Sequence, residues 1–339
     1  VAVSGTDGKI TLIATSKGTA GNEITLANVG GTIAQAPLKL AGGIGFTRSN
    51  LEIYRPHGIS MTPSDGLFTT SSFTVRGLYK FSGGSDAHPL LQSLLRLNVT
   101  GTHADADKEA TIVNIVAEKG LISAYISDDP TSAKVNSMTL NINNLTGSVI
   151  DGDPWSISFS RKDGIENQST YSDEYILSAA KYTGGNRMVF ATTSSFFPKN
   201  SNSVFSKVSD RNTSGSFLAI GSQSLGPSTR FINNSSETKQ KHTNFTGKVA
   251  YINFWSGHKD NKEFIGFAKN PNSAGAKNPA VNYNFTHKET GSFDRLRLLT
   301  YSKQATTASD NSGNFRMFDF SQNNIHLEAK GLEPNKVVL

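Results

Sequence analysis

The sequence predicts an all-β protein whose main body is an antiparallel sandwich of the jelly-roll type. Two observations indicate this fold class. Many short segments alternate apolar and polar side chains with a period of two, and turn-forming residues separate them at regular intervals. The chain also has 31 glycines among its 339 residues, which suits many short connections between strands.

The same signals divide the chain into three parts. Residues 1–45 are expected to form a small N-terminal β module, with strands at Lys9–Ala14 and Glu23–Ala27 on either side of a glycine-rich turn. Residues 46–278 carry the jelly-roll pattern. Residues 279–339 resume the β rhythm in SFDRLRLLTYS, GNFRMFDFS and NIHLEAKG, and are expected to form a β-rich C-terminal extension.

The central part contains the clearest strand patterns. They are FTVRGLYKF, ATIVNIVAE, LISAYIS, SMTLNIN, PWSISFS, EYILSAAK, RMVFATT, GSFLAIGS and GKVAYINFW. PLLQSLLRLNV is apolar enough for a helix or a strand, but its β-rich surroundings and the bracketing Pro89 and Gly101 favour a strand. The one persuasive helix begins at Asn261 in NKEFIGFAKNP, with Pro271 just beyond its end.

The stretch DGDPWSISFSRKDG places two aspartates beside a tryptophan, as a sugar-binding or sugar-cleaving cleft does. In a strand, Trp155, Ile157 and Phe159 fall on one face and three serines fall on the other. The apolar row predicts that Trp155 lies in the core. Asp151 and Asp153 are then interpreted as the turn that leads into the strand, with a ligand role for their carboxylates as the alternative.

GKVAYINFW is apolar on both faces. Strict alternation places Ala250, Ile252 and Phe254 opposite Val249, Tyr251 and Trp255. This pattern predicts a central strand covered on its second face by a loop or by the short helix, and the alternative is a face between subunits.

The composition excludes several classes of protein. Without cysteine, the chain has neither disulfides nor thiolate metal sites. The basic residues behind the net charge of +6 are scattered, so the sequence predicts no nucleic-acid partner, although weak attraction to an acidic cell surface stays open. No segment reaches the roughly 18 apolar residues of a membrane span, so no membrane insertion is expected. Because the chain begins with Val1, we expect it to be processed or to be part of a longer product.

Catalytic motifs are weak throughout the sequence. There is no E-x-D-x-x-E string of the kind that laminarinase-type sandwich glycosidases carry, and no metalloprotease, P-loop or nucleophile-elbow motif. The sequence therefore predicts a protein that is not an enzyme and has no cofactor. A polysaccharide-degrading enzyme stays as a third alternative, with sugar release dependent on Asp105 or Asp107.

Calcium is the one metal for which candidates exist. Asp105, Asp107 and Glu109 in THADADKEA bring oxygen ligands close together, although the tight glycine turn of a helical calcium loop is missing. The pairs Asp128–Asp129 and Asp151/Asp153 are comparable candidates.

Several motifs occur in the order of a known fold. PWSISFSR, GSFLAIGSQSL and FTGKVAYINFWSGHKDNKEFIGFAKNPNSAG resemble the second half of a laminin-G or concanavalin-A-like jelly roll. Together with LLRLNVTG, ATIVNIVAE, GSFDRLRLL and FRMFDFSQNN, they also resemble large virion structural proteins of marine tailed bacteriophages. This resemblance implies a laminin-G/concanavalin-A-like sandwich and a building or attachment role, and it supplies no catalytic residues.

Residues and resemblance together predict a non-enzymatic virion structural protein in a tail, neck, fibre or capsid-surface position. Its expected partners are other virion proteins, including copies of itself in a homo-oligomer. The alternative is a glycan-binding adhesin or receptor-binding module. Its candidate contacts are Tyr171 and Tyr175 in the expected loop STYSDEYIL and Phe196 and Phe197 in SSFFPKN, for which core or loop anchoring is the competing explanation.

Overall fold

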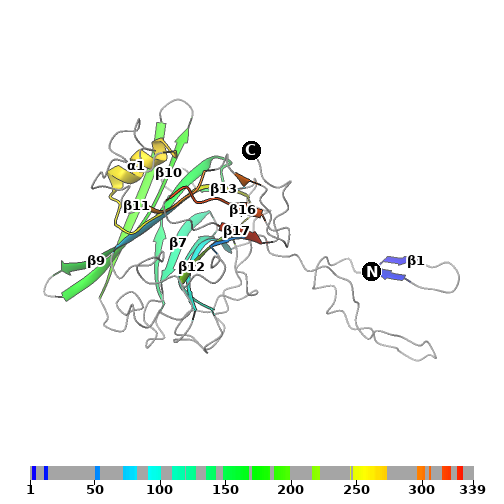
Figure 1. Ribbon diagram of the computed structural model, residues 1–339, viewed down its shortest axis with the longest axis horizontal. Helices are drawn as coiled ribbons and strands as arrows, with labels where there is room; N and C mark the ends of the chain where they lie inside the picture. Colours follow the sequence, from blue (N-terminus) through cyan, green and yellow to red (C-terminus); the bar gives the residue numbers. More distant parts are fainter. Residues whose placement is uncertain are drawn as a thin grey trace. The chain divides into compact units, whose positions relative to one another are not determined.

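The structure is a computed structural model of the full chain. It describes residues 2–4, 11–13, 50–53, 72–81, 91–100, 109–118, 120–126, 135–142, 148–167, 170–183, 187–198, 216–221, 245, 247–272, 296–301, 305–306, 315–321 and 327–330. These residues are almost entirely in antiparallel strands, as the sequence predicted (Figure 1).

The chain divides into two compact units, Val1–Arg48 and Ser49–Leu339. In the first unit, β1 (Ala2–Ser4) pairs antiparallel with β2 (Thr11–Ile13). β2 lies within the first strand predicted there, whereas Glu23–Ala27 lies outside the described residues.

The second unit contains two sheets. The first has six strands in the order β11-β10-β9-β4-β13-β14. Their bounds are β4 Phe73–Phe81, β9 Pro154–Asn167, β10 Thr170–Thr183, β11 Arg187–Pro198, β13 Gly247–Trp255 and β14 Leu296–Leu299.

The second sheet has nine strands in the order β15-β16-β17-β3-β12-β5-β6-β7-β8. Their bounds are β3 Asn50–Ile53, β5 Leu91–Thr100, β6 Glu109–Glu118, β7 Leu121–Ile126, β8 Asn136–Leu140, β12 Ser216–Ile220, β15 Ala305–Thr306, β16 Phe315–Met317 and β17 Leu327–Lys330. β5 confirms the strand expected after Pro89. Strands from the predicted C-terminal extension join both sheets.

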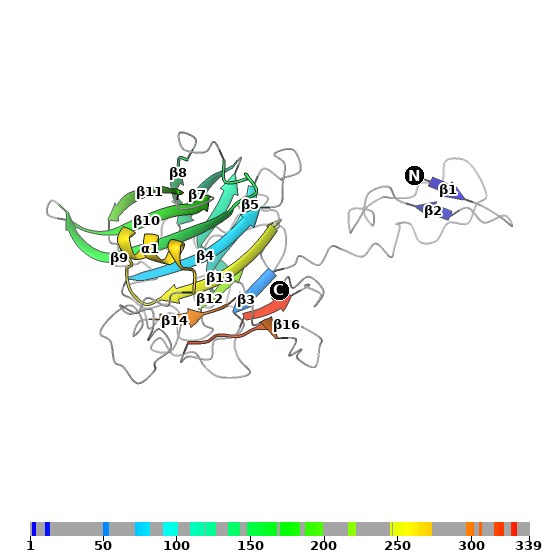
Figure 2. The ribbon, with the colours of Figure 1, turned by 90° about the horizontal axis from the view of Figure 1, so that it is seen from above.

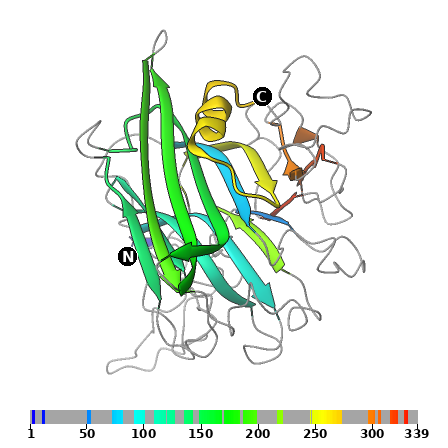
Figure 3. The ribbon, with the colours of Figure 1, turned by 90° about the vertical axis from the view of Figure 1, so that its left-hand side faces the viewer.

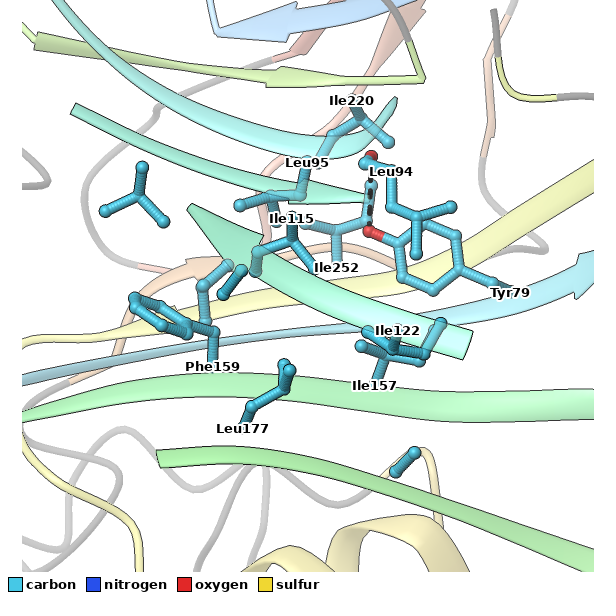
Figure 4. Packing of buried hydrophobic residues seen from close by; sticks show 14 of the residues in the cluster. Tyr79, Leu94, Leu95, Ile115, Ile122, Ile157, Phe159, Leu177, Ile220 and Ile252 are labelled. Carbon is cyan, nitrogen blue, oxygen red and sulfur yellow. Dashed lines mark hydrogen bonds between the residues drawn. The ribbon is translucent and has the colours of Figure 1, made fainter. Parts of the chain in front are cut away.

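Figures 2 and 3 show the strands of the two sheets from two further sides. One apolar core lies between the sheets. Ile157, Phe159 and Leu177 from the six-stranded sheet meet Leu95, Ile115, Ile122 and Ile220 from the nine-stranded sheet (Figure 4). All of these side chains are buried. The predicted inward row of β9 is confirmed, because Trp155, Ile157 and Phe159 all belong to this core.

A β-bulge in β13 changes the predicted alternation. Tyr251 adopts φ 51°, and the register with β4 shifts between Ala250 and Asn253. The extra residue places Val249 on the same core as Ile252 and Phe254, whereas strict alternation had put Val249 on the opposite face. Trp255 belongs to the other face and stacks on Phe267 at 4.8 Å between ring centroids.

The predicted helix is α1, Asn261–Lys269. Its capping box is complete, since the backbone N–H of Glu263 donates to Asp260 Oδ1 at 2.8 Å and the backbone N–H of Asp260 donates to Glu263 Oε2 at 3.0 Å. Phe264 and Phe267 are buried against the outer face of the six-stranded sheet. The helix therefore covers the second apolar face of β13, as the sequence predicted.

Gly77 makes room for the ring of Tyr79 on β4. A Cβ atom at Gly77 would lie 2.6 Å from Tyr79 Cε2, and Tyr79 is fully buried. A Cβ atom added at Gly266 in α1 would meet no neighbouring atom within 4 Å. These two glycines form a matched pair for the same substitution.

We expect Gly77→Ala to lower the free energy of unfolding by about 1–3 kcal/mol, because the buried ring has to move. Gly266→Ala is expected to raise the free energy of unfolding by about 0.5–1 kcal/mol, since alanine stabilises an exposed helical position relative to glycine. Urea unfolding measures both. Equal effects of the two substitutions would contradict this account of Gly77.

Candidate functional site

The calcium candidates lie almost wholly outside the described residues. Asp105, Asp107 and the Asp128–Asp129 pair are not described, and Glu109 is the first residue of β6, with its side chain outside the described part. Within the part of the chain that the structure describes, no three His, Asp or Glu side chains come together to hold a metal ion. The site at Asp105, Asp107 and Glu109 stays a prediction.

Two of the four glycan candidates belong to the core. Tyr175 is fully buried and stacks on Phe159 at 5.9 Å, and Phe197 packs against Tyr175 at 5.5 Å. Tyr171 and Tyr175 lie in β10, so the loop expected at STYSDEYIL is wrong, because the strand begins at Thr170. The side chain of Tyr171 is outside the described residues.

Asp151 and Asp153 anchor the start of β9. Lys181, from β10, binds both carboxylates and lies 5.2 Å from the centre of the Trp155 ring. Asp151 also accepts hydrogen bonds from Trp155 Nε1 at 3.1 Å and from the backbone N–H of Asp153 at 3.0 Å. Burial alone lowers the pKa of Lys181, but hydrogen bonds and charge from the two aspartates outweigh it and raise this pKa above its ordinary value. These contacts support the structural interpretation of DGDPWSISFSRKDG.

A buried ion pair fixes the far end of the same two strands. Arg161 donates from Nε and Nη2 to Asp173 Oδ2 at 3.0 and 2.6 Å, and Asp163 accepts a further bond from Nη2 at 3.0 Å. Gly164, at φ 63°, donates its N–H to Asp173 Oδ1. This network holds the register shift between Ser172 and Glu174 in one geometry.

The outer face of β9, β10 and β11 beside α1 combines charged, hydroxyl and aromatic side chains among the described residues. Register places Lys162, Glu174 and Phe196 in one row across the three strands. The next rows are Ser160–Ile176–Ser194 and Ser158–Ser178–Thr192, and the hydroxyls of Ser178 and Thr192 are hydrogen-bonded at 2.9 Å. We call these three rows the outer-face platform.

Phe196 is the exposed aromatic of this platform. Its side chain is 46% exposed, and it is the one large hydrophobic residue exposed to this degree in the described ranges. Thr192 and Ser194 of the same strand are also exposed, whereas Ser158, Ser160 and Ser178 are buried. The platform therefore opens to solvent along β11 and at the row that contains Phe196.

His258 lies at the inner border of the platform. Its Nδ1 is 2.8 Å from Ser160 Oγ, a contact that joins the loop after β13 to β9. Burial and the charge of Lys162 lower the pKa of His258, while Glu174, Glu263 and Asp260 raise it in part, and the net shift is downward. The imidazole is therefore largely neutral at neutral pH and offers both a donor and an acceptor.

The platform combines an exposed aromatic ring with hydroxyls, an imidazole and charges of both signs. A pyranose ring has an apolar face and a rim of hydroxyls, which match an aromatic side chain and hydrogen-bonding groups respectively. This arrangement suits a carbohydrate chain lying across an open sheet.

The outer face of the nine-stranded sheet carries a second polar cluster. Arg96 is fully buried and donates from Nε to Ser93 Oγ at 3.0 Å, and that hydroxyl bonds Asn114 Oδ1 at 3.2 Å. Ser123 and Thr139 are hydrogen-bonded farther along the same sheet at 2.9 Å. Because Arg96 is buried, this cluster is closed to solvent there, and it differs in this respect from the platform.

Sequence analysis found Phe196 but missed the other platform residues. Lys162, Glu174 and His258 are far apart in sequence, and only the pairing of β9 with β10 and the loop before α1 bring them together. The serines of PWSISFS were recognised as one face of a strand. Their position next to His258 required the order of strands in the sheet.

No family model matches the chain, and the search of curated proteins finds no match. Solved structures do show similarity. Tailspike protein 2 of an Escherichia coli bacteriophage aligns at 14% identity and a TM-score of 0.34, over 61% of this chain and 22% of the tailspike. A protein from Bacteroides ovatus that is provisionally assigned as carbohydrate-binding aligns at 11% identity and a TM-score of 0.38. The alignment covers 84% of this chain and 56% of the Bacteroides protein.

The endo-beta-1,4-glucuronan lyase of Trichoderma reesei aligns at 9% identity and a TM-score of 0.29, over 60% of this chain and 80% of the lyase. The chain thus spans about a fifth of the tailspike. At these TM-scores the alignments transfer neither a site nor a mechanism.

The neighbours correct one expectation from the sequence. They include an enzymatically active tailspike domain and lyases that act on polysaccharides, and this finding overturns the expectation that the protein is not an enzyme. In the described residues there is also no helix with the length and apolar character needed to cross a membrane.

The anchoring role of Asp151 can be tested against Asp153. We expect Asp151→Ala to lower the free energy of unfolding by about 2–3 kcal/mol, because it removes the less exposed of the two ion-pair partners of Lys181 and leaves the Trp155 N–H without its acceptor. Asp153→Ala is expected to cost less than about 1 kcal/mol, since that carboxylate is 44% exposed and makes one of the two ion pairs. Urea unfolding at pH 7 measures the difference, and equal losses would contradict the assignment.

Proposed function

We propose that this chain is a tail-associated component of a tailed-phage virion that binds cell-surface polysaccharide through the outer-face platform. The observation that carries the proposal is the row Lys162–Glu174–Phe196, in which the exposed aromatic side chain pairs with Glu174 and Lys162 follows on the next strand. The neighbouring Ser194 and Thr192 continue the polar surface along β11.

The position of the platform supports this function. The Arg161–Asp173 network and the long β9–β10 pairing hold its backbone from behind, so little conformational entropy is lost when a ligand binds. The charges of Lys162 and Glu174 favour a polysaccharide with ionic groups. The net charge of +6 adds a general attraction to acidic cell surfaces.

The virion assignment is supported by the order of sequence motifs and by the all-β build without cysteine. Such a protein keeps its fold outside the cell through packing and assembly. Among the described strands, β11 pairs only with β10 and is an edge strand of its sheet. Pairing of this edge with a second copy or with another virion protein would be consistent with assembly.

Polysaccharide binding is tested with a glycan array and then by titration of the best-bound polymer, with and without calcium. We expect Phe196→Ala to weaken binding at least about tenfold. An aromatic side chain that becomes buried under a bound sugar contributes roughly 1.5–3 kcal/mol to the free energy of binding. Phe196→Tyr keeps the ring and should retain binding. Ser137→Ala, at an exposed position of β8, is the control that should change nothing.

Reducing-sugar release is followed in the same titrations, so that cleavage is not mistaken for weak binding. If Phe196→Ala instead leaves every glycan interaction intact and alters the sedimentation coefficient, the platform is a contact between protein chains and the polysaccharide proposal is wrong.

Virion location is tested by mass spectrometry of purified particles. The protein is expected at a fixed copy number relative to the major tail proteins and resistant to high-salt washing. Its recovery only as a free protein in the lysate, and never in particles, would contradict this part of the proposal.

A further inference from the structure

Arg76 occupies an unusual position on β4. Its side chain is 1% exposed and points to the outer face, where α1 covers it. The guanidinium carbon lies 5.2 Å from the ring centre of Phe267 in α1 and 6.0 Å from that of Trp255 in β13. Helix and sheet thus close around a charged group.

The polar atoms around Arg76 are incompletely satisfied. Nη2 donates to the carbonyl oxygen of Pro271 at 3.0 Å, but Nε and Nη1 are buried without a hydrogen-bond partner. Trp255 Nε1, beside the same Phe267 ring, is also buried without an acceptor. Three donor nitrogens without hydrogen-bond partners therefore lie near the Phe267 ring, and each unmade bond carries a large desolvation cost.

The charge of Arg76 also has no carboxylate partner in the part of the chain that the structure describes. No ion pair to a carboxylate is found for it within the described ranges, and its register partners Asn253 and Ser158 are uncharged. Burial lowers the pKa of Arg76 to about 9, with a smaller opposing effect from Tyr251. The group consequently remains protonated at neutral pH.

The two aromatic rings stabilise the cation in part, but they accept none of the unused hydrogen bonds, which an acceptor with negative charge would satisfy together with the charge. A water molecule satisfies N–H groups but leaves the charge uncompensated. We propose that a small inorganic anion of halide size binds between Arg76 and the indole N–H of Trp255, beneath α1. The site is separate from the outer-face platform and does not depend on the proposed function.

The first experiment compares thermal unfolding in sodium chloride and in sodium gluconate at equal ionic strength, because gluconate is too large for an enclosed site. We expect chloride to raise the Tm of the native protein by about 2 °C or more at saturation. Arg76→Met should abolish this difference between the salts. Lys248→Met, which removes an exposed charge of β13, should preserve it and thereby control for general salt effects.

The second experiment leaves Arg76 intact, so it decides the question even if Arg76→Met does not fold. Trp155 and Trp255 are the only tryptophans of the chain, and Trp155→Phe leaves Trp255 as the only indole. Bromide is expected to quench Trp255 fluorescence along a saturable curve that chloride shifts competitively and acetate, as a small carboxylate, shifts more weakly.

Two results would overturn the proposal. One is an equal Tm in chloride and gluconate with bromide quenching that is linear or absent. The other is an Arg76→Met variant that is more stable than the native protein by the same amount in chloride and in gluconate, which would mean that the native guanidinium is an uncompensated charge or is hydrated by water.

Discussion

The apolar layer between the two sheets supplies the cohesion on which every other feature depends. The chain has no cysteine, so no covalent link restrains the strands, and the side chains of this layer are almost completely removed from water. Tyr79 shows how closely the layer is packed, since its ring occupies the space that a side chain at residue 77 would need. Because side chains alternate along a strand, packing of the inner side chains in this layer also fixes the positions of the outer side chains.

The outer face of the six-stranded sheet is divided by α1. Under the helix, Trp255, Phe264 and Phe267 form small apolar clusters, and the buried Arg76 sits among them. Beyond the helix the same strands present hydroxyls, charges and Phe196 to solvent. One sheet therefore combines an enclosed cationic position and an open polar surface, with His258 and its bond to Ser160 at the boundary.

Sequence patterns predicted the parts of the fold that local chemistry determines. Period-two alternation placed Trp155, Ile157 and Phe159 in the core, and α1 was found from its polar start and the proline beyond its end. The bulge at Tyr251 was not predictable, because Val249, Ala250 and Ile252 around it are all apolar and either phase of alternation looked acceptable. Tyr175 was misplaced in a loop because the polar residues before it belong to a long strand. Arg76 gave no signal, since one arginine in an alternating strand normally faces water.

The two phenylalanines at the end of β11 have a consequence for the hairpin itself. Phe196 faces outward and Phe197 packs on Tyr175, so a slip of one residue against β10 would exchange a buried ring for an identical one at nearly no hydrophobic cost. Correct alignment must then be enforced at a distance, where Ala191 faces the core and Thr192 meets Ser178. The small side chains in the middle of the hairpin thus determine its register, and the two phenylalanines at its end follow from that register.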